Sequence, residues 1–249
     1  MIHKKTQAEI ELMHEGGKKL AKIRDFLKDS ITPGVTPLEL DEMAEKKIIE
    51  AGGESSFKKV RGYKWTTCIN INDGVVHGIP TKKPIQDKDL VKLDVGMFYK
   101  GFHTDTSFTV QAGTDEPEVD KFVAVGREAL KKAIHEARIG NKIGHISLAM
   151  QQVFDKYGVS PVRALTGHGV GKTLHEEPQI PCFWEGDPEK SEEIVLGSVF
   201  AIEAIYTQGD PDLVVLEDNW TIATKDGKIA GLFEETVAVT DKGNLVLTA

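Results

Sequence analysis

The sequence predicts an α+β fold in which two similar halves, each made of two helices followed by strands, surround a central antiparallel sheet. Helix start signals and strand-like runs occur in this order twice along the 249 residues. Thr6 and Asp115, each at the start of a half's first helix, lie 109 positions apart. Asp94 and Glu203, which stand in strand-like runs, are separated by the same 109 positions. The halves share no convincing residue identity, so a coincidental spacing is the alternative to a pseudo-twofold duplication.

Two helices are predicted at the start of the first half. The stretch TQAE at 6–9 has the pattern of a capping box, and the apolar spacing after it predicts a helix over about 7–28. The stretch TPLE at 36–39 is a stronger start signal, because proline follows the threonine cap at the first helical position. We expect this second helix to reach Gly52. Strands then dominate from 66 to 111.

The second half repeats this order. The stretch DEPE at 115–118 predicts a capped third helix that runs to about 138, and a fourth helix covers about 144–157. Strands return from 161 to 240. Loops are expected to interrupt them at 183–193 and 208–212. No linker of low complexity separates the halves, so we expect one domain, 1–249, with halves of about 1–111 and 112–249.

Composition and charge exclude several classes of protein. The chain is 40% hydrophobic and carries a net charge of -8, which argues against a nucleic-acid-binding surface. Cys68 and Cys182 stand in no spaced motif, which indicates a reducing compartment and excludes a cysteine zinc site. No stretch has the apolar core of a signal peptide or the roughly 20 apolar residues of a membrane span. We expect a cytoplasmic, soluble protein, and nothing in the sequence requires more than a monomer.

Four carboxylates interrupt runs that otherwise read as apolar strands. They are Asp94, Asp105, Glu203 and Glu234. A lone carboxylate in a strand interior costs several kcal/mol or takes up a proton. No matching set of arginines or lysines stands nearby in the sequence. The sequence therefore predicts that these carboxylates share one or two metal ions.

The spacing of Asp94 and Asp105 predicts a hairpin with its turn at FYKG. If the turn is centred between Tyr99 and Lys100, the two carboxylates face each other directly. If it is centred on Lys100 and Gly101, they are diagonal neighbours on the same face. Two like charges this close repel each other unless a cation bridges them or they share a proton. The alternative is that one of them caps a loop or pairs with a lysine.

Histidines and glycines mark a second element. The stretch TGHGVGKTLHEEP at 166–178 places His168 and His175 around closely spaced glycines, which allow the backbone to approach a site. A phosphate-binding loop is excluded, because that motif requires glycine where Thr166 stands. His77, in VVHGIP, is a further candidate, although a histidine before glycine and proline is often only a loop residue. In the last carboxylate run the alternation favours Glu234 over its neighbour Glu235 only weakly.

Carboxylates with one imidazole suit Mn²⁺, Fe²⁺, Co²⁺ or Mg²⁺ better than a thiolate zinc site would. So many anionic ligands balance two ions, about 3.5–4 Å apart, better than one. Such a pair makes hydroxide available near neutral pH. The residues alone therefore predict hydrolysis at a carbonyl or phosphoryl centre.

Five stretches taken together resemble those of a known family. The chain is similar over nearly its whole length to methionine aminopeptidase, type I, of peptidase family M24, which has the pita-bread (creatinase/aminopeptidase) fold. The stretches are NINDGVVHGIP, LDVGMFYKGFHTDTSFTV, TGHGVGKTLHEEP, FAIEAIY and FEETVAVTDKG. The chain departs from the family pattern at Leu174, at Glu235 and over 55–60, which bears on selectivity and metal preference rather than on the reaction class.

The resemblance implies a role for each matching residue. The implied ligands of two divalent ions (Mn, Fe or Co, with Zn or Mg as further options) are Asp94, Asp105, His168, Glu203 and Glu234. His77 and His175 correspond to histidines that contact the substrate and handle the proton or the oxyanion. Glu203 also corresponds to the general acid and base. The residues that match the wall of the methionine pocket are Tyr63, Cys68 and Trp220.

The implied reaction removes the initiator methionine from nascent polypeptides when the second residue is small. The partners implied are the N-termini of these chains and the ribosome, with no direct binding to nucleic acid or membrane. The alternative enzyme is a proline dipeptidase or aminopeptidase P of the same fold. The alternative of another class is a non-catalytic pita-bread module that binds proteins.

Overall fold

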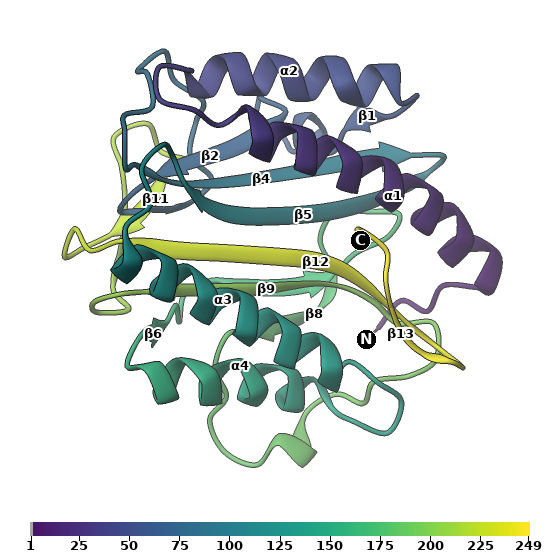
Figure 1. Ribbon diagram of the computed structural model, residues 1–249. Helices are drawn as coiled ribbons and strands as arrows, with labels where there is room; N and C mark the ends of the chain where they lie inside the picture. Colours follow the sequence, from purple (N-terminus) through teal and green to yellow (C-terminus); the bar gives the residue numbers. More distant parts are fainter. Residues whose placement is uncertain (1) are drawn as a thin grey trace.

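The computed structural model describes residues 2–249, which form helices packed on one face of a large twisted sheet (Figure 1). The helices are α1 (Gln7–Ser30), α2 (Pro37–Glu50), α3 (Pro117–Glu136) and α4 (Ile143–Tyr157), with short 3₁₀ turns at Phe57–Lys59 and Pro188–Lys190. The strands of the first half are β1 (Glu54–Ser55), β2 (Thr67–Ile71), β3 (Gly74–Val76), β4 (Leu90–Tyr99) and β5 (Phe102–Gln111). Those of the second half are β6 (Ser160–Pro161), β7 (Thr166–Gly169), β8 (Glu176–Pro181), β9 (Val199–Thr207), β10 (Leu213–Val215), β11 (Ile222–Thr224), β12 (Ala230–Thr240) and β13 (Gly243–Val246).

The predicted caps of the first two helices are confirmed. The side chains of Thr6 and Thr36 each accept a hydrogen bond from the N–H of the third helical residue, a glutamate whose carboxylate accepts one from the N–H of the cap. The predicted cap of α3 is wrong. Pro117 is the first residue of that helix, so the cap is Glu116 and not Asp115, and no side chain caps it. The backbone N–H lost to proline is one that a helix start leaves unpaired, so this start needs the cap less.

The order of strands in the large antiparallel sheet confirms the predicted pseudo-twofold arrangement. Its main path runs β1-β4-β5-β12-β9-β7-β8, so β5 of the first half lies beside β12 of the second. Helix α1 packs on β4 and β5, and α3 packs on β9 and β12. Figure 1 shows these two helices side by side over the same face of the sheet. The opposite face of the sheet is therefore not covered by these two helices.

The hairpin β4–β5 has the second of the two registers considered from the sequence. Asp105 lies opposite Gly96, and Asp94 lies opposite Ser107, so the carboxylates are diagonal neighbours. The direct opposition of Asp94 and Asp105 is wrong. The turn is centred on Lys100 and Gly101, both with positive φ (48° and 93°), as a tight two-residue hairpin turn requires.

Threonine side chains join β5 to β12 at the seam between the halves. The Thr109 hydroxyl accepts a hydrogen bond from the Leu232 N–H (2.9 Å) and donates one to the Leu232 carbonyl (2.7 Å). The Thr236 hydroxyl does the same with Asp105, at 2.9 Å from its N–H and 2.8 Å from its carbonyl. Thr109 reaches from β5 to β12, and Thr236 reaches from β12 to β5. Side chains thus take the place of ladder hydrogen bonds at these two positions, on either side of the main-chain pairing at Glu234 and Glu235.

Candidate active site

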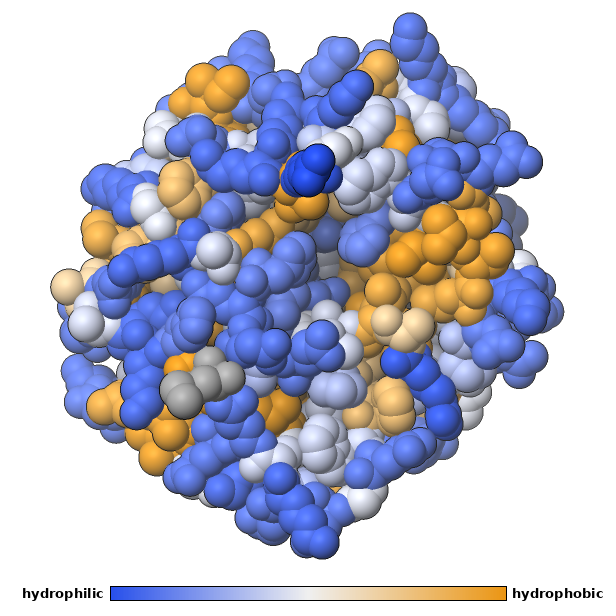
Figure 2. All heavy atoms as spheres, turned by 180° about the vertical axis from the view of Figure 1, so that it is seen from behind, coloured by the Kyte–Doolittle hydropathy of each residue, from blue (hydrophilic) through white to orange (hydrophobic). Residues whose placement is uncertain are grey.

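A cavity of about 140 Å³ lies on the sheet face opposite α1 and α3. Figure 2 shows this side of the molecule, which is hollowed near its centre with hydrophobic side chains gathered beside the hollow. The residues predicted from the sequence all line the cavity: Tyr63, Cys68, His77, Asp94, Asp105, His168, His175, Glu203, Trp220 and Glu234. Elements far apart in the chain therefore bring all of the predicted side chains to one place.

Register places the carboxylates in neighbouring positions across four strands. Glu203 of β9 lies directly opposite Glu234 of β12. On β5, Ser107 lies opposite both Glu234 and Asp94. Asp105 stands two positions before Ser107, on the same face of β5. The sheet thus holds two carboxylates from each half of the chain.

The tightest group among residues 2–249 consists of Asp105, His168 and Glu234. Each offers a ligand atom, and these atoms lie within 4.8 Å of one another. All three side chains are buried. Glu203 joins them, since its Oε1 is 3.6 Å from Nε2 of His168. Asp94 lies near enough to Asp105 for the two carboxyls to affect each other's pKa.

Hydrogen bonding fixes the orientation of His168. Its Nδ1 lies 2.8 Å from the carbonyl oxygen of Gly169, which only accepts hydrogen bonds, so Nδ1 carries the proton. Nε2 therefore presents its lone pair to the carboxylates. Burial, with His175 nearby, lowers the pKa of His168 to about 4, so the ring is neutral at pH 7. This is the protonation state that a metal ligand requires.

The four carboxyl groups raise one another's pKa values. Burial raises the pKa of Asp94 to about 7. Burial and then the Asp94 charge raise the pKa values of Asp105 and Glu203 well above their usual range. Burial and the Asp105 charge do the same to Glu234. Without a cation, this cluster cannot hold all of its negative charge at neutral pH.

Two orphaned oxygens show that the site fits a divalent metal. Asp94 Oδ1 and Glu234 Oε1 are buried and have no hydrogen-bond partner within residues 2–249. Buried polar atoms of a native protein normally have a partner. The partner missing from these two oxygens is therefore something other than a protein atom of the described residues. Carboxylate oxygens with one imidazole nitrogen are donors suited to Mn²⁺, Fe²⁺, Co²⁺ or Mg²⁺. The donor set and its geometry therefore fit a metal centre.

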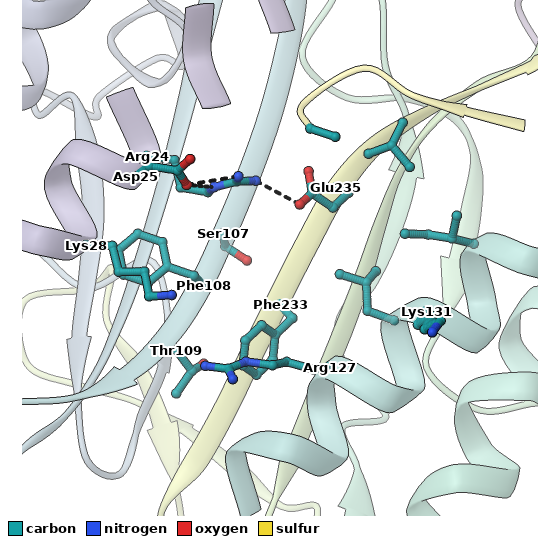
Figure 3. Close-up of a pocket in the computed structure, with 14 residues that line it drawn as sticks. Arg24, Asp25, Lys28, Ser107, Phe108, Thr109, Arg127, Lys131, Phe233 and Glu235 are labelled. Carbon is teal, nitrogen blue, oxygen red and sulfur yellow. Dashed lines mark hydrogen bonds and ion pairs between the residues drawn. The ribbon is translucent and has the colours of Figure 1, made fainter. Parts of the chain in front are cut away.

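Glu235 faces away from this centre. Its Oε1 accepts a hydrogen bond from Arg24 at 2.7 Å, and its other oxygen is bonded to the Thr248 hydroxyl. Figure 3 shows this ion pair in a separate cavity of about 460 Å³, between α1 and α3 on the helix-covered face. The structure therefore shows which of the two adjacent glutamates faces the cavity, a choice that the sequence pattern favoured only weakly.

Two histidines stand at the rim of the cavity. His77 and His175 are exposed, and neither imidazole has a hydrogen-bond partner among residues 2–249. The His175 ring lies edge-on to His168, with the ring centroids 4.5 Å apart. His77 follows directly after β3 and has φ = 59°, which turns the chain at the cavity. Both side chains are free to meet a bound substrate.

An apolar wall closes one side of the cavity. Tyr63 packs edge-on against Trp220, with ring centroids 5.1 Å apart, and its hydroxyl donates to the Thr67 carbonyl at 2.8 Å. The Tyr63 ring thus adds no unsatisfied polar atom to the wall. Cys68 and Leu174 are buried beside it. Further lining residues are Phe57, Val60 and Val76.

Sequence reasoning named Leu174 and 55–60 only as departures from the family, and it missed Val76. The signal for Phe57 and Val60 was the density of aromatic residues over 57–65. Val76 was open to inference from its position next to His77.

Comparisons with known proteins identify the family of this chain. A family model described as metallopeptidase family M24 matches residues 11–241. A methionine aminopeptidase of Bacillus subtilis is 38% identical over 248 residues, covering 100% of this chain and 99% of the relative. The crystal structure of a methionine aminopeptidase from Thermotoga maritima superposes with a TM-score of 0.96 at 36% identity, over 100% of this chain and 99% of that one. A prolidase from Pyrococcus furiosus shares the fold, with a TM-score of 0.79 at 23% identity, over 99% of this chain and 65% of the prolidase.

The chain belongs to metallopeptidase family M24. Within that family its full-length relatives are methionine aminopeptidases, and their pita-bread fold is the fold of this chain. The predicted family and fold are therefore confirmed. No helix within residues 2–249 has the length and apolar character needed to cross a bilayer.

Proposed function

We propose that this chain hydrolyses the peptide bond after an N-terminal methionine when the second residue is small. The observation that carries the proposal is one cavity with two unlike walls. One wall bears the carboxylates and His168, and the other is apolar and contains Cys68 and aromatic rings. A methionine side chain is apolar and polarizable, which suits a wall of sulfur and aromatic groups. The substrates are the N-termini of nascent polypeptides.

The metal centre is proposed to hold two divalent ions of the Mn, Fe or Co type, with Zn or Mg as further options. The ligands are Asp94, Asp105, His168, Glu203 and Glu234. When bound, such ions supply a nucleophile at neutral pH and polarise the scissile carbonyl. The raised carboxyl pKa values support this assignment, because bound cations would keep the same carboxyls ionised.

Three residues of this chain handle charge and protons in the proposed reaction. His77 and His175 donate hydrogen bonds from their exposed imidazoles to the oxyanion that develops on the scissile carbonyl. Glu203, half-buried at the edge of the cluster, transfers a proton to the leaving amine. The apolar wall binds the methionine side chain and keeps water away from that part of the substrate.

The proposal extends to the whole chain and its surroundings. We propose that residues 1–249 form a single catalytic domain, since both halves contribute ligands to one cavity. We further propose that the protein acts in the cytoplasm as a monomer, on chains that emerge from the ribosome.

A peptide panel tests the proposed specificity. We expect cleavage of Met-Ala-Ser and Met-Gly-Met, weak cleavage when the second residue is Leu or Arg, and no cleavage of x-Pro peptides. Release of free methionine is the measurement. Cleavage confined to x-Pro substrates would assign the chain to the proline-specific alternative. Metal-replete protein inactive on every peptide would favour the non-catalytic module.

His77→Ala is expected to lower kcat by about ten- to a thousandfold, as loss of one oxyanion donor does in other hydrolases. The matched control is His135→Ala, which removes an exposed imidazole on α3. We expect the control to keep the wild-type rate on Met-Ala-Ser. An unchanged kcat in His77→Ala would show that His77 does not stabilise the oxyanion and is only a loop residue.

A further inference from the structure

Lys92 is a buried lysine that the proposed reaction does not use. It lies in β4, two positions before Asp94, and its side chain is fully buried. A buried ammonium group costs several kcal/mol unless it is paired and hydrogen-bonded. Lys92 forms no ion pair within residues 2–249, and its Nζ instead contacts the carbonyl oxygens of Asn72 at 2.6 Å and Leu90 at 3.3 Å. Among residues 2–249 the hydrogen-bond partners of Nζ are therefore main-chain oxygens, while the charges of Asp73 and Asp89 act on it without an ion pair.

The carbonyl that Lys92 contacts most closely belongs to a junction of three strands. The Asn72 carbonyl also accepts a hydrogen bond from the N–H of Ala230, the first residue of β12. The Asn72 side-chain oxygen accepts one from Leu90 N–H at 2.8 Å, at the start of β4. Asn72 itself has φ = 50° in the turn between β2 and β3. Asparagine is among the residues that adopt this conformation most readily, and the contacts of its carbonyl and side chain tie the turn to β4 and β12.

Each strand that leaves the junction carries a residue of the site. β3 leads within five positions from Asn72 to His77. β4 leads from Lys92 to Asp94, and β12 leads from its first residue to Glu234. Short lengths of main chain therefore connect the junction to the histidine at the rim and to two carboxylates.

We propose that Lys92 is a positioning residue whose ammonium group acts as an internal cation in a site of main-chain carbonyls, holding the turn that presents His77. The inference rests on the proposed function for its kinetic consequence, and on the structure alone for the cation site. Removal of the side chain in Lys92→Ala leaves a cavity lined by two carbonyl oxygens. A small ammonium ion has the charge and donors to fill it.

The experiment compares Lys92→Ala with Lys92→Met, which fills the space without a charge or a donor. Both variants are expected to lower kcat on Met-Ala-Ser at least about fivefold, with KM changed less than twofold. Ammonium or methylammonium should restore kcat in Lys92→Ala only. Tetramethylammonium, at equal ionic strength, is too large for the cavity and has no donor, so it should restore nothing.

A second measurement needs neither metal nor substrate. The melting temperature of chelator-treated Lys92→Ala should rise with ammonium concentration and not with tetramethylammonium, because a ligand that binds only the folded state stabilises it. Lys92→Met should show no such difference. If Lys92→Ala is too unstable to purify without ammonium, its recovery only in ammonium is the same result.

Two results would overturn the inference. One is a Lys92→Met enzyme with wild-type kcat and melting temperature. The other is a Lys92→Ala protein whose rate and stability respond equally to ammonium and tetramethylammonium. If wild-type protein cleaves no Met-peptide but the ammonium-dependent melting is present, the proposed function fails and the cation site stands.

Discussion

Glu234→Gln is expected to lower kcat/KM on Met-Ala-Ser by about a thousandfold or more, equivalent to about 4 kcal/mol of transition-state stabilisation. Glu235→Gln, one residue away, is expected to keep kcat/KM within about threefold of wild type. The two side chains point to opposite faces of β12. Glu234 lies within 4.8 Å of the ligand atoms of Asp105 and His168, whereas Glu235 is paired with Arg24 under α1.

The same two variants should have opposite effects on the stability of metal-free protein. Burial and the Asp105 charge raise the pKa of Glu234, so folding of the metal-free protein must protonate this carboxyl; Glu234→Gln removes that cost and should raise the melting temperature. Glu235→Gln weakens the hydrogen-bonded ion pair with Arg24, so it should cost about 1–3 kcal/mol. Metal content per protein, determined after dialysis, should fall in Glu234→Gln alone. Full activity and metal content in Glu234→Gln would contradict its assignment as a ligand.

Removal of divalent metal is expected to abolish turnover. Chelation followed by desalting should bring the rate to background, and re-addition of Mn²⁺, Fe²⁺, Co²⁺, Zn²⁺ or Mg²⁺ in turn should identify the ions that restore it. Ca²⁺ is the matched control, because its larger coordination number suits this compact donor set poorly. A chelated enzyme that retains its rate would refute the metal-dependent mechanism.

The stability of the chelated protein should fall as pH rises from about 5 to 7. Four carboxyls have folded-state pKa values raised above those of the unfolded chain, so the folded state binds more protons. Their stabilisation is complete at low pH and is lost as pH passes through the folded pKa, which is about 7 for Asp94. Lys92, whose pKa burial lowers to about 7, keeps its proton below that pH in the folded protein, so it does not oppose this fall.

Metal should reverse this dependence, because ligands must lose their protons to bind it. The rise in melting temperature on adding Mn²⁺ is therefore expected to be larger at pH 8 than at pH 7. The measurement is thermal unfolding of chelated protein with and without Mn²⁺ at the two pH values. An equal rise at both would show that the carboxyls are already ionised in the metal-free protein.

Local signals in the sequence predicted the helices well. The reciprocal caps at Thr6 and Thr36 are in the sequence itself, and both are present. The start of α3 was misplaced because Pro117 sets the first helical residue more strongly than the capping pattern at 115–118 does. Element order and the paired halves followed from the same local signals.

Register was harder to predict, because it depends on one turn. Lysine is not a residue expected at φ = 48°, yet Lys100 takes this conformation beside Gly101. A shift of the turn centre by one residue changed directly opposed aspartates into diagonal ones. Periodicity also could not decide clearly between Glu234 and Glu235. Both faces of β12 are buried, one under α3 and one over the cavity, so alternation carried little information.

The hydroxyls of Thr109 and Thr236 join β5 to β12, so the spacing between the carboxylates of the first half and those of the second depends on single oxygen atoms. Valine has nearly the shape of threonine but no hydroxyl. At position 109 or 236 it would leave a buried N–H and a buried carbonyl of the opposite strand without hydrogen-bond partners. An ordinary backbone ladder would tolerate that exchange. Thr236 is hydrogen-bonded to the main chain of Asp105 and stands two residues from Glu234, so one hydroxyl fixes the spacing of carboxylates contributed by the two halves.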